Sequence, residues 1–196
     1  MSKENENLTK KSKDLLDKLN NQSLDKVNTL RNKIERMNKY KNTTLLCDVS
    51  GSMSLEIQAE NKEYPHKRAI DLLNEVLINF KGANIYEFST YTYKVRKLSE
   101  PNGETNMARA FETIKSAGIK ETILLTDGLP DSPAAALEAA KGLIINIIYI
   151  GPQPTPEFLK VLAAQSGAKF TSVKLIRQGA ELLLENKIKG FITGEV

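Results

Sequence analysis

From residue 42 onward, apolar segments of strand length alternate with segments of helix length, and this alternation limits the fold more than any other feature. Strands are predicted at Thr43–Cys47, Asn84–Phe88, Tyr91–Leu98, Thr122–Thr126, Ile144–Ile150 and Lys169–Val173. Helices are predicted at about Pro65–Phe80, Met107–Ser116, Ser132–Lys141, Thr155–Gln165 and Arg177–Lys189. Such alternation predicts an α/β fold with a doubly wound, mostly parallel sheet and helices on both faces.

The link between the second and third predicted strands sets the direction of one edge strand. Only Ser89 and Thr90 separate these two segments, whereas a parallel crossover needs about a dozen residues or more. Because the link is so short, the two strands are expected to form an antiparallel hairpin. The sheet is therefore predicted to have six strands, one of them an antiparallel edge strand.

Charge divides the chain into two parts. Residues 1–41 carry 11 Lys and Arg against 6 Asp and Glu, a net charge of +5, whereas residues 42–196 carry 17 Lys and Arg against 18 Asp and Glu, a net charge of −1. The length of 196 residues and the hydrophobic fraction of 40% also predict one domain with an appendage. We predict a basic, partly disordered helical leader over residues 1–41 and a domain over residues 42–196. An apolar stripe in the leader predicts a helix that packs on the domain or forms a helical pair with another copy.

Cysteine usage and hydropathy favour a cytoplasmic protein. Cys47 is the only cysteine, so no internal disulfide can form. The longest apolar run, residues 143–150, has strand length, and no run approaches the roughly 18 residues of a membrane span. The polar N-terminus has no apolar segment typical of a signal peptide. No membrane association is expected.

One carboxylate and two hydroxyls follow the first predicted strand at alternate positions. Asp48, Ser50 and Ser52 come directly after the apolar run 44–47. Hard oxygen donors in this arrangement suit a hard divalent cation such as Mg²⁺ or Mn²⁺. Because one carboxylate leaves such an ion short of negative charge, an acidic ligand is also expected from elsewhere in the chain.

Two later segments carry donors of the same kind. Thr105 follows a glycine turn at the start of a predicted helix, and Asp127 follows the predicted strand Thr122–Thr126. Asp-x-Ser-x-Ser, then Gly-x-Thr, then Thr-Asp-Gly, in this order, resembles the von Willebrand factor type A family over roughly residues 42–190. The chain looks like the compact intracellular versions of bacteria and phages, because it lacks the disulfides of many extracellular relatives.

The resemblance implies a complete metal-ion-dependent adhesion site. Carried over position by position, its ligands for Mg²⁺ or Mn²⁺ are Asp48, Ser50, Ser52, Thr105 and Asp127. The implied strand order, 3-2-1-4-5-6, makes the strands before Asp48 and Asp127 neighbours, and ligands of such sheets bind beyond the carboxyl ends of the strands where the order reverses. The two aspartates are therefore expected to meet at one crevice, with Thr105 in reach.

The implied function is metal-dependent binding of a protein, without catalysis. In the family, an Asp or Glu of a partner protein often completes the metal's coordination. Partners that the resemblance makes plausible are an AAA+ ATPase or a second copy of this chain. The sequence does not identify the partner.

Two other functions stay open. The basic leader could attract nucleic acid, with the domain as a scaffold, although Tyr40 is its only aromatic residue for base stacking. A magnesium-dependent phosphotransferase or hydrolase would also place an Asp at a strand end. Such enzymes use Asp-x-Asp, whereas Ser50 occupies the second position here.

Two residues beside the motifs have structural interpretations. Asp131 is predicted as an N-cap or turn residue for the next helix, with support of the metal site as the alternative. Cys47 alternates away from Asp48 in its strand, so we predict a small core residue there.

Overall fold

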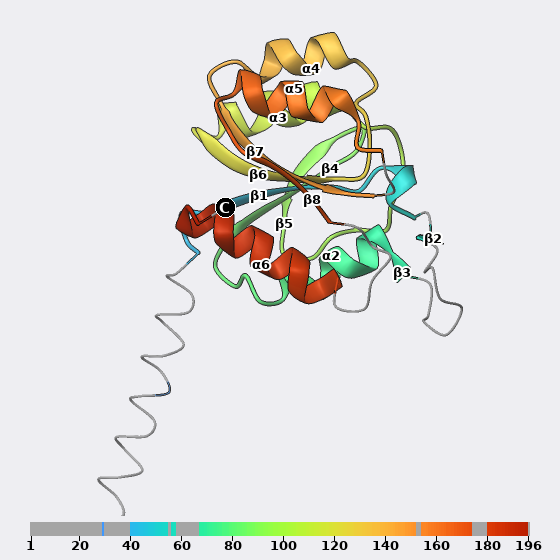
Figure 1. The fold of residues 1–196 in the computed structure, drawn as a ribbon. Helices are drawn as coiled ribbons and strands as arrows, with labels where there is room; N and C mark the ends of the chain where they lie inside the picture. The colour runs from blue at the N-terminus through green and yellow to red at the C-terminus, as the bar shows by residue number, and fades with distance from the viewer. Residues whose placement is uncertain are drawn as a thin grey trace, which may run out of the picture.

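The computed structural model describes Thr29 and residues 40–54, 56–57, 67–151, 154–173 and 180–195. Six strands form one sheet in the order β5-β4-β1-β6-β7-β8 (Figure 1). They are β1 (Thr44–Asp48), β4 (Asn84–Phe88), β5 (Thr92–Val95), β6 (Glu121–Thr126), β7 (Ile144–Ile150) and β8 (Phe170–Val173). Every neighbouring pair is parallel except β4 and β5. The predicted doubly wound order and its antiparallel edge strand are confirmed.

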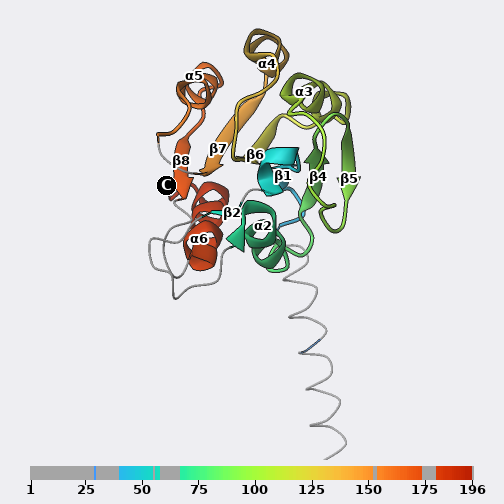
Figure 2. The same cartoon turned by 90° about the vertical axis from the view of Figure 1, so that its right-hand side faces the viewer.

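Helices cover both faces of this sheet. They are α2 (Ala69–Leu77), α3 (Met107–Ser116), α4 (Pro133–Ala140), α5 (Glu157–Gln165) and α6 (Ala180–Thr193). Figures 1 and 2 show α2 and α6 side by side on one face and α3, α4 and α5 on the other. The molecule therefore has three layers, as the alternation of strands and helices predicted.

The central strand β1 packs against both helical layers. Leu45 and Cys47 belong to the core cluster under α2 and α6, whereas Leu46 belongs to the cluster under α3, α4 and α5. All three side chains are fully buried, because successive residues of a strand point to opposite faces of the sheet. A strand covered on both faces has to be apolar throughout, which explains the run before Asp48. The predicted core position of Cys47 is confirmed.

The start of the first predicted helix was wrong. Its segment Lys67–Arg68 is a short strand, β3, which pairs antiparallel with β2 (Glu56–Ile57), so α2 begins only at Ala69. Neither this small two-stranded sheet nor the 3₁₀ helix η1 (Gly51–Ser54) was predicted. Pairs of two residues are too short to leave a periodic pattern in the sequence.

Four strands have boundaries that differ from the prediction, and the differences in β1 and β5 are the largest. β1 includes Asp48 because this residue pairs with Phe88 of β4, and the next amide, Val49, still donates to the Phe88 carbonyl at 2.8 Å. β5 is shorter than predicted and ends at Val95, where its ladder with β4 ends. The first difference matters for function, because it holds the Asp48 backbone within the sheet.

The predicted leader lies outside the described residues except for Thr29, Tyr40 and Lys41. Its helices, their packing and the division at residue 41 therefore stay predictions. Tyr40 is buried and its ring lies 5.0 Å from that of Phe80, centroid to centroid. Among the residues that the structure describes, no helix has both the length and the apolar character to cross a membrane.

Candidate metal site

The structure places Asp48 and Asp127 beside each other at the carboxyl end of the sheet. Asp48 ends β1, and Asp127 directly follows β6, the parallel neighbour of β1. The chain runs from β1 to β4 on one side, whereas β6 lies on the other. This is the point where strand order reverses, and open α/β sheets bind their ligands beyond the carboxyl ends of the strands at such a point.

The Asp48 carboxylate is fully buried and accepts two short hydrogen bonds. Its Oδ1 accepts from the backbone amide of Ser50 at 2.8 Å, and its Oδ2 accepts from the Thr126 hydroxyl at 2.6 Å. The first bond turns the chain sharply after β1. The second joins the ends of β1 and β6. Asp48 is therefore held in one orientation from both sides.

A chain of hydroxyls connects the loop after β1 to the second aspartate. The Oγ atoms of Ser50 and Ser52 lie 3.1 Å apart, and Ser52 Oγ donates to Asp127 Oδ1 at 2.8 Å. Met53, next in η1, is completely buried and anchors this loop in the core. Four of the predicted ligands thus form one continuous polar cluster.

Thr105 lies on a separate loop, just before α3, that is joined to the loop after β1. The Gly51 amide donates to the Gly103 carbonyl at 3.1 Å and joins the two loops. The Thr105 amide donates to Asp131 Oδ1 at 3.0 Å, while the Asp131 amide donates to the Thr105 carbonyl at 3.1 Å. Thr105 is 8% exposed. It therefore lies in a segment held by hydrogen bonds, although no hydrogen bond links its hydroxyl to the other four predicted ligands, all of which the structure describes.

Asp131 is not the N-cap of α4, so that part of its prediction was wrong. The residue that caps α4 is Ser132, and Asp131 instead holds the amide of Thr105. α4 begins one residue too late for Asp131 to be its N-cap. Asp131 therefore supports the loop that carries a predicted ligand.

The two aspartates lie in an environment that disfavours their negative charge. Burial raises the pKa of Asp48 above its ordinary value, and the charge of Asp131 raises it too, while hydrogen bonds from Ser50 and Thr126 lower it. Burial and the charge of Asp48 raise the pKa of Asp127 to about 6. Both shifts mean that the ionised carboxylates are more costly here than in water.

The donor set fits a hard divalent cation. In the described part of the chain, no Lys or Arg forms an ion pair or hydrogen bond with Asp48 or Asp127. No three His, Cys, Asp or Glu side chains gather into a metal-binding group within the same residues. One buried and one half-buried carboxylate with neighbouring hydroxyls, without a protein cation to neutralise them, are the oxygen donors that Mg²⁺ or Mn²⁺ takes.

Sequence reasoning missed the role of Thr126. Its hydroxyl donates to Asp48 and accepts from the Gly128 amide at 3.2 Å, so it connects both aspartate-bearing segments. The available signal was a hydroxyl residue at the last, fully buried position of an apolar strand. A polar side chain in that position needs a partner, and the carboxylate at the end of the neighbouring strand is within its reach.

Gly103 is required where the two ligand-bearing loops approach the β4–β5 turn. Its φ is +73°, and a Cβ there would lie 2.6 Å from Thr90 Oγ1. Gly118 has a similar φ of +77° but open space around it. We expect Gly103→Ala to lower the free energy of unfolding by about 2 kcal/mol and Gly118→Ala by about 1 kcal/mol, because only the first adds a clash to the backbone strain. Urea unfolding of both variants measures the difference; equal losses would contradict the close approach.

Comparison with solved structures identifies the fold. The manganese-loaded TRAP protein of Plasmodium vivax is 23% identical, with a TM-score of 0.53, over 79% of this chain and 74% of that one. A von Willebrand factor type A protein from Catenulispora acidiphila is 19% identical, with a TM-score of 0.55, over 78% of this chain and 42% of that one. No family model matches the sequence, and no curated protein matches it either. By its three-layered architecture and these structural neighbours, the chain has the von Willebrand factor type A fold.

Proposed function

We propose that the chain is a divalent-metal-dependent protein-binding module. Asp48, Ser50, Ser52, Thr105 and Asp127 would hold Mg²⁺ or Mn²⁺, and a carboxylate of a partner protein would complete the coordination. The observation that carries the proposal is the cluster of buried and half-buried oxygen donors, without a neutralising protein cation, at the switch point of the sheet. A structural neighbour described as manganese-loaded supports it. A cytoplasmic setting is part of the proposal.

Some residues of the site would bind the metal ion, and others orient the residues that bind it. Asp48 and Asp127 supply negative charge, and the three hydroxyls supply neutral oxygens. Thr126 and Asp131 orient these ligands through the hydrogen bonds at 2.6 and 3.0 Å. When bound, a divalent ion with so few charged ligands would keep enough positive charge to attract an external carboxylate.

In this proposal the site binds without catalysing. A nucleophilic serine needs an adjacent base that takes its proton. Ser50 and Ser52 hydrogen-bond to each other, and Ser52 donates to a carboxylate that would itself hold the metal. Both hydroxyls would be ligands, which leaves neither of them as a nucleophile.

Affinity capture tests the proposal directly. The immobilised wild type, Asp48→Asn and Glu138→Gln are each exposed to native lysate in Mg²⁺ and in EDTA, and the retained proteins are identified by mass spectrometry. Glu138 is an exposed carboxylate of α4 that pairs with Lys141, so it serves as a matched control. We expect partners that require Mg²⁺ and are lost only in Asp48→Asn. The same proteins in all six experiments would overturn the proposal.

The identity of the captured protein separates the two partner classes that we propose. An AAA+ ATPase among the retained proteins would place the module in an assembly machine. A second copy of the chain would indicate self-association, which sedimentation of the purified protein with and without Mg²⁺ measures independently.

Asp131 is expected to act on metal affinity by positioning Thr105. Asp131→Ala removes the acceptor for the Thr105 amide, and we expect Mg²⁺ affinity to fall about tenfold, the lower end for groups that orient metal ligands. Asp131→Asn keeps an acceptor oxygen and should keep most of the affinity. Isothermal titration with Mg²⁺ compares the two. If both variants lose affinity equally, the charge of Asp131 is what matters, and its positioning role is refuted.

A further inference from the structure

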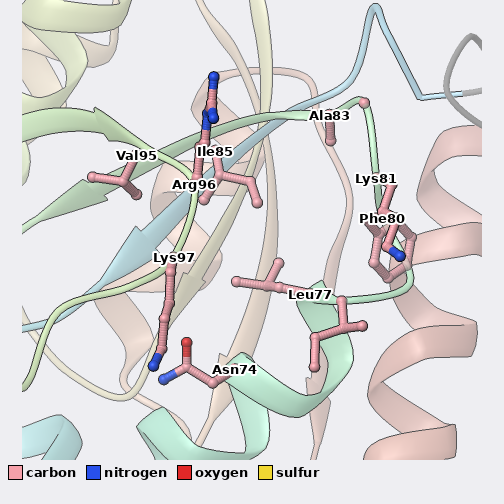
Figure 3. A pocket seen from close by; sticks show the side chains of 11 residues that line it. Asn74, Leu77, Phe80, Lys81, Ala83, Ile85, Val95, Arg96 and Lys97 are labelled. Atoms are coloured by element: carbon pink, nitrogen blue, oxygen red, sulfur yellow. The ribbon is translucent and has the colours of Figure 1, made fainter.

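A cavity lies at the other end of β4 from the candidate metal site. Its volume is about 390 Å³, and its walls come from the end of α2, the α2–β4 loop and β5 (Figure 3). Ala83 and Ile85 line it at the start of β4, whereas Phe88, at the end of β4, pairs with Asp48. The length of the strand therefore separates the cavity from the predicted metal ligands.

The centre of the cavity is apolar. Ile85 and Val95 are opposite partners on β4 and β5, and Figure 3 shows Ile85 pointing toward Leu77 of α2. Phe80 closes one end, and the exposed Ile78 extends the apolar surface to the rim. Such a surface gains free energy when an apolar side chain covers it.

Positive charge surrounds this apolar centre. Lys81 lies near Phe80 at one end, and Lys97 extends toward Asn74 at the other, while Arg96 points away from α2 at the rim (Figure 3). Among the residues that the structure describes, no Asp or Glu lines the cavity. In the portion of the chain that the structure describes, none of these three cations forms an ion pair.

We propose that this cavity, between α2 and the β4–β5 hairpin, binds an acidic segment of a partner protein in which an apolar residue stands between carboxylates. The apolar side chain would enter the cavity between Leu77, Ile85 and Val95. Carboxylates on either side of it would meet Lys81 and Lys97. The site is separate from the metal site and needs no metal.

The geometry favours a peptide over other anions. A fatty acid carries one carboxylate and could satisfy only one of two lysines at opposite ends of the cavity. A flat bilayer surface cannot reach an apolar centre that lies inside a concavity. A nucleic acid would need an exposed ring for stacking, and Phe80 is 1% exposed.

Fluorescence polarisation with a labelled probe peptide tests this inference. The probe has one Leu between two pairs of Glu, and its controls replace Leu by Ala or every Glu by Gln. All measurements use the full chain carrying Asp48→Asn in EDTA, so that the peptide's carboxylates cannot bind through a metal. Dodecanoate and anionic phosphatidylserine vesicles are tested as competitors.

Charge reversal at the cavity provides the decisive comparison. Lys81→Glu combined with Lys97→Glu should weaken binding of the probe roughly tenfold or more, since two attractions become repulsions. Lys120→Glu combined with Lys141→Glu makes the same change in charge at exposed lysines that do not line the cavity. This control should bind as the parent protein does, and the methyl resonances of Ile85 and Val95 should shift with the probe.

Each contrary result would overturn the inference. The first is that the probe peptide does not bind in EDTA. The second is that the control variant, Lys120→Glu with Lys141→Glu, loses as much affinity as the cavity variant. The third is that the peptide still binds after its Leu is replaced by Ala. Displacement by dodecanoate or vesicles, together with no dependence on the peptide's Leu, would assign the cavity to a lipid instead. Because the metal site is disabled throughout, failure here leaves the metal-dependent function untouched, and failure of that function leaves this result untouched.

Discussion

Asp48→Asn is expected to weaken Mg²⁺ binding by about a hundredfold or more while leaving the metal-free protein at least as stable as the wild type. The loss of affinity follows from charge. Asp48 is one of only two carboxylates in the donor set, and the other donors are neutral hydroxyls. Replacing one of the two carboxylates by an amide halves the negative charge that the proposed site can offer to a divalent cation.

The effect on stability has the opposite sign for a physical reason. Burial raises the pKa of Asp48, so ionising this carboxyl group costs more free energy in the folded protein than in the unfolded chain. Asn has nearly the same shape, and its oxygen can still accept from the Ser50 amide, which donates to Oδ1 at 2.8 Å. Its amide group can donate to the Thr126 hydroxyl in place of the present bond. The polar cluster is therefore kept and the buried charge is removed.

Two measurements on one protein separate these effects. Isothermal titration with Mg²⁺ gives the affinity, and urea unfolding in EDTA gives the free energy of unfolding. Glu138→Gln, which removes an exposed carboxylate on α4, should change neither. If Asp48→Asn unfolded far more easily in EDTA than the wild type, Asp48 would be a structural residue, and its loss of Mg²⁺ would carry no information about coordination.

Most of the fold could be predicted because its strands and helices are long enough to leave a pattern of apolar residues in the sequence. Eight-residue apolar runs such as 143–150 and the two-residue link at Ser89 and Thr90 determine the parallel centre and the antiparallel edge of the sheet. The β2–β3 pair could not be predicted, because each of its strands has two residues and their pairing depends on tertiary contact. The start of α2 was misplaced for the same reason.

Some features of the candidate site could be predicted from the sequence, and others could not. Asp48 and Asp127 could be placed together because both stand at the ends of strands, and strand order brings strand ends together. The roles of Thr126 and Asp131 depend on hydrogen bonds between segments that are far apart in sequence, 78 residues for Thr126 and Asp48. Such bonds leave no local pattern. Capping chemistry, which does, pointed to the wrong role for Asp131.

Lowering the pH is expected to stabilise the metal-free wild type more than it stabilises Asp127→Asn. In the folded state the pKa of Asp127 is about 6, above its ordinary value of 3.8. Between pH 3.8 and about pH 6, the Asp127 carboxyl is therefore protonated in a larger fraction of the folded molecules than of the unfolded ones. The free energy of unfolding therefore falls as pH rises through about 6 and is restored as pH falls toward 3.8.

The full shift corresponds to about 3 kcal/mol, of which about 1 kcal/mol is recovered between pH 7 and pH 5. Other groups also titrate in this range, so the quantity to measure is the difference between wild type and Asp127→Asn. Urea unfolding in EDTA should show the variant to be the more stable protein at pH 7, with the difference shrinking at pH 5. A difference that is constant with pH would show that Asp127 keeps an ordinary pKa.

Saturating Mg²⁺ should largely cancel this pH dependence. A bound cation stabilises the ionised form of Asp127, so protons and Mg²⁺ compete for the same carboxylate. At about a hundred times its dissociation constant, a ligand that binds only the folded state adds about 2.7 kcal/mol of stability. We expect this gain at pH 7, a smaller gain at pH 5, and little at either pH in Asp127→Asn. Stabilisation by Mg²⁺ that is equal at both pH values would place the ion away from Asp127, because a site built on that carboxylate has to lose affinity when it takes up its proton.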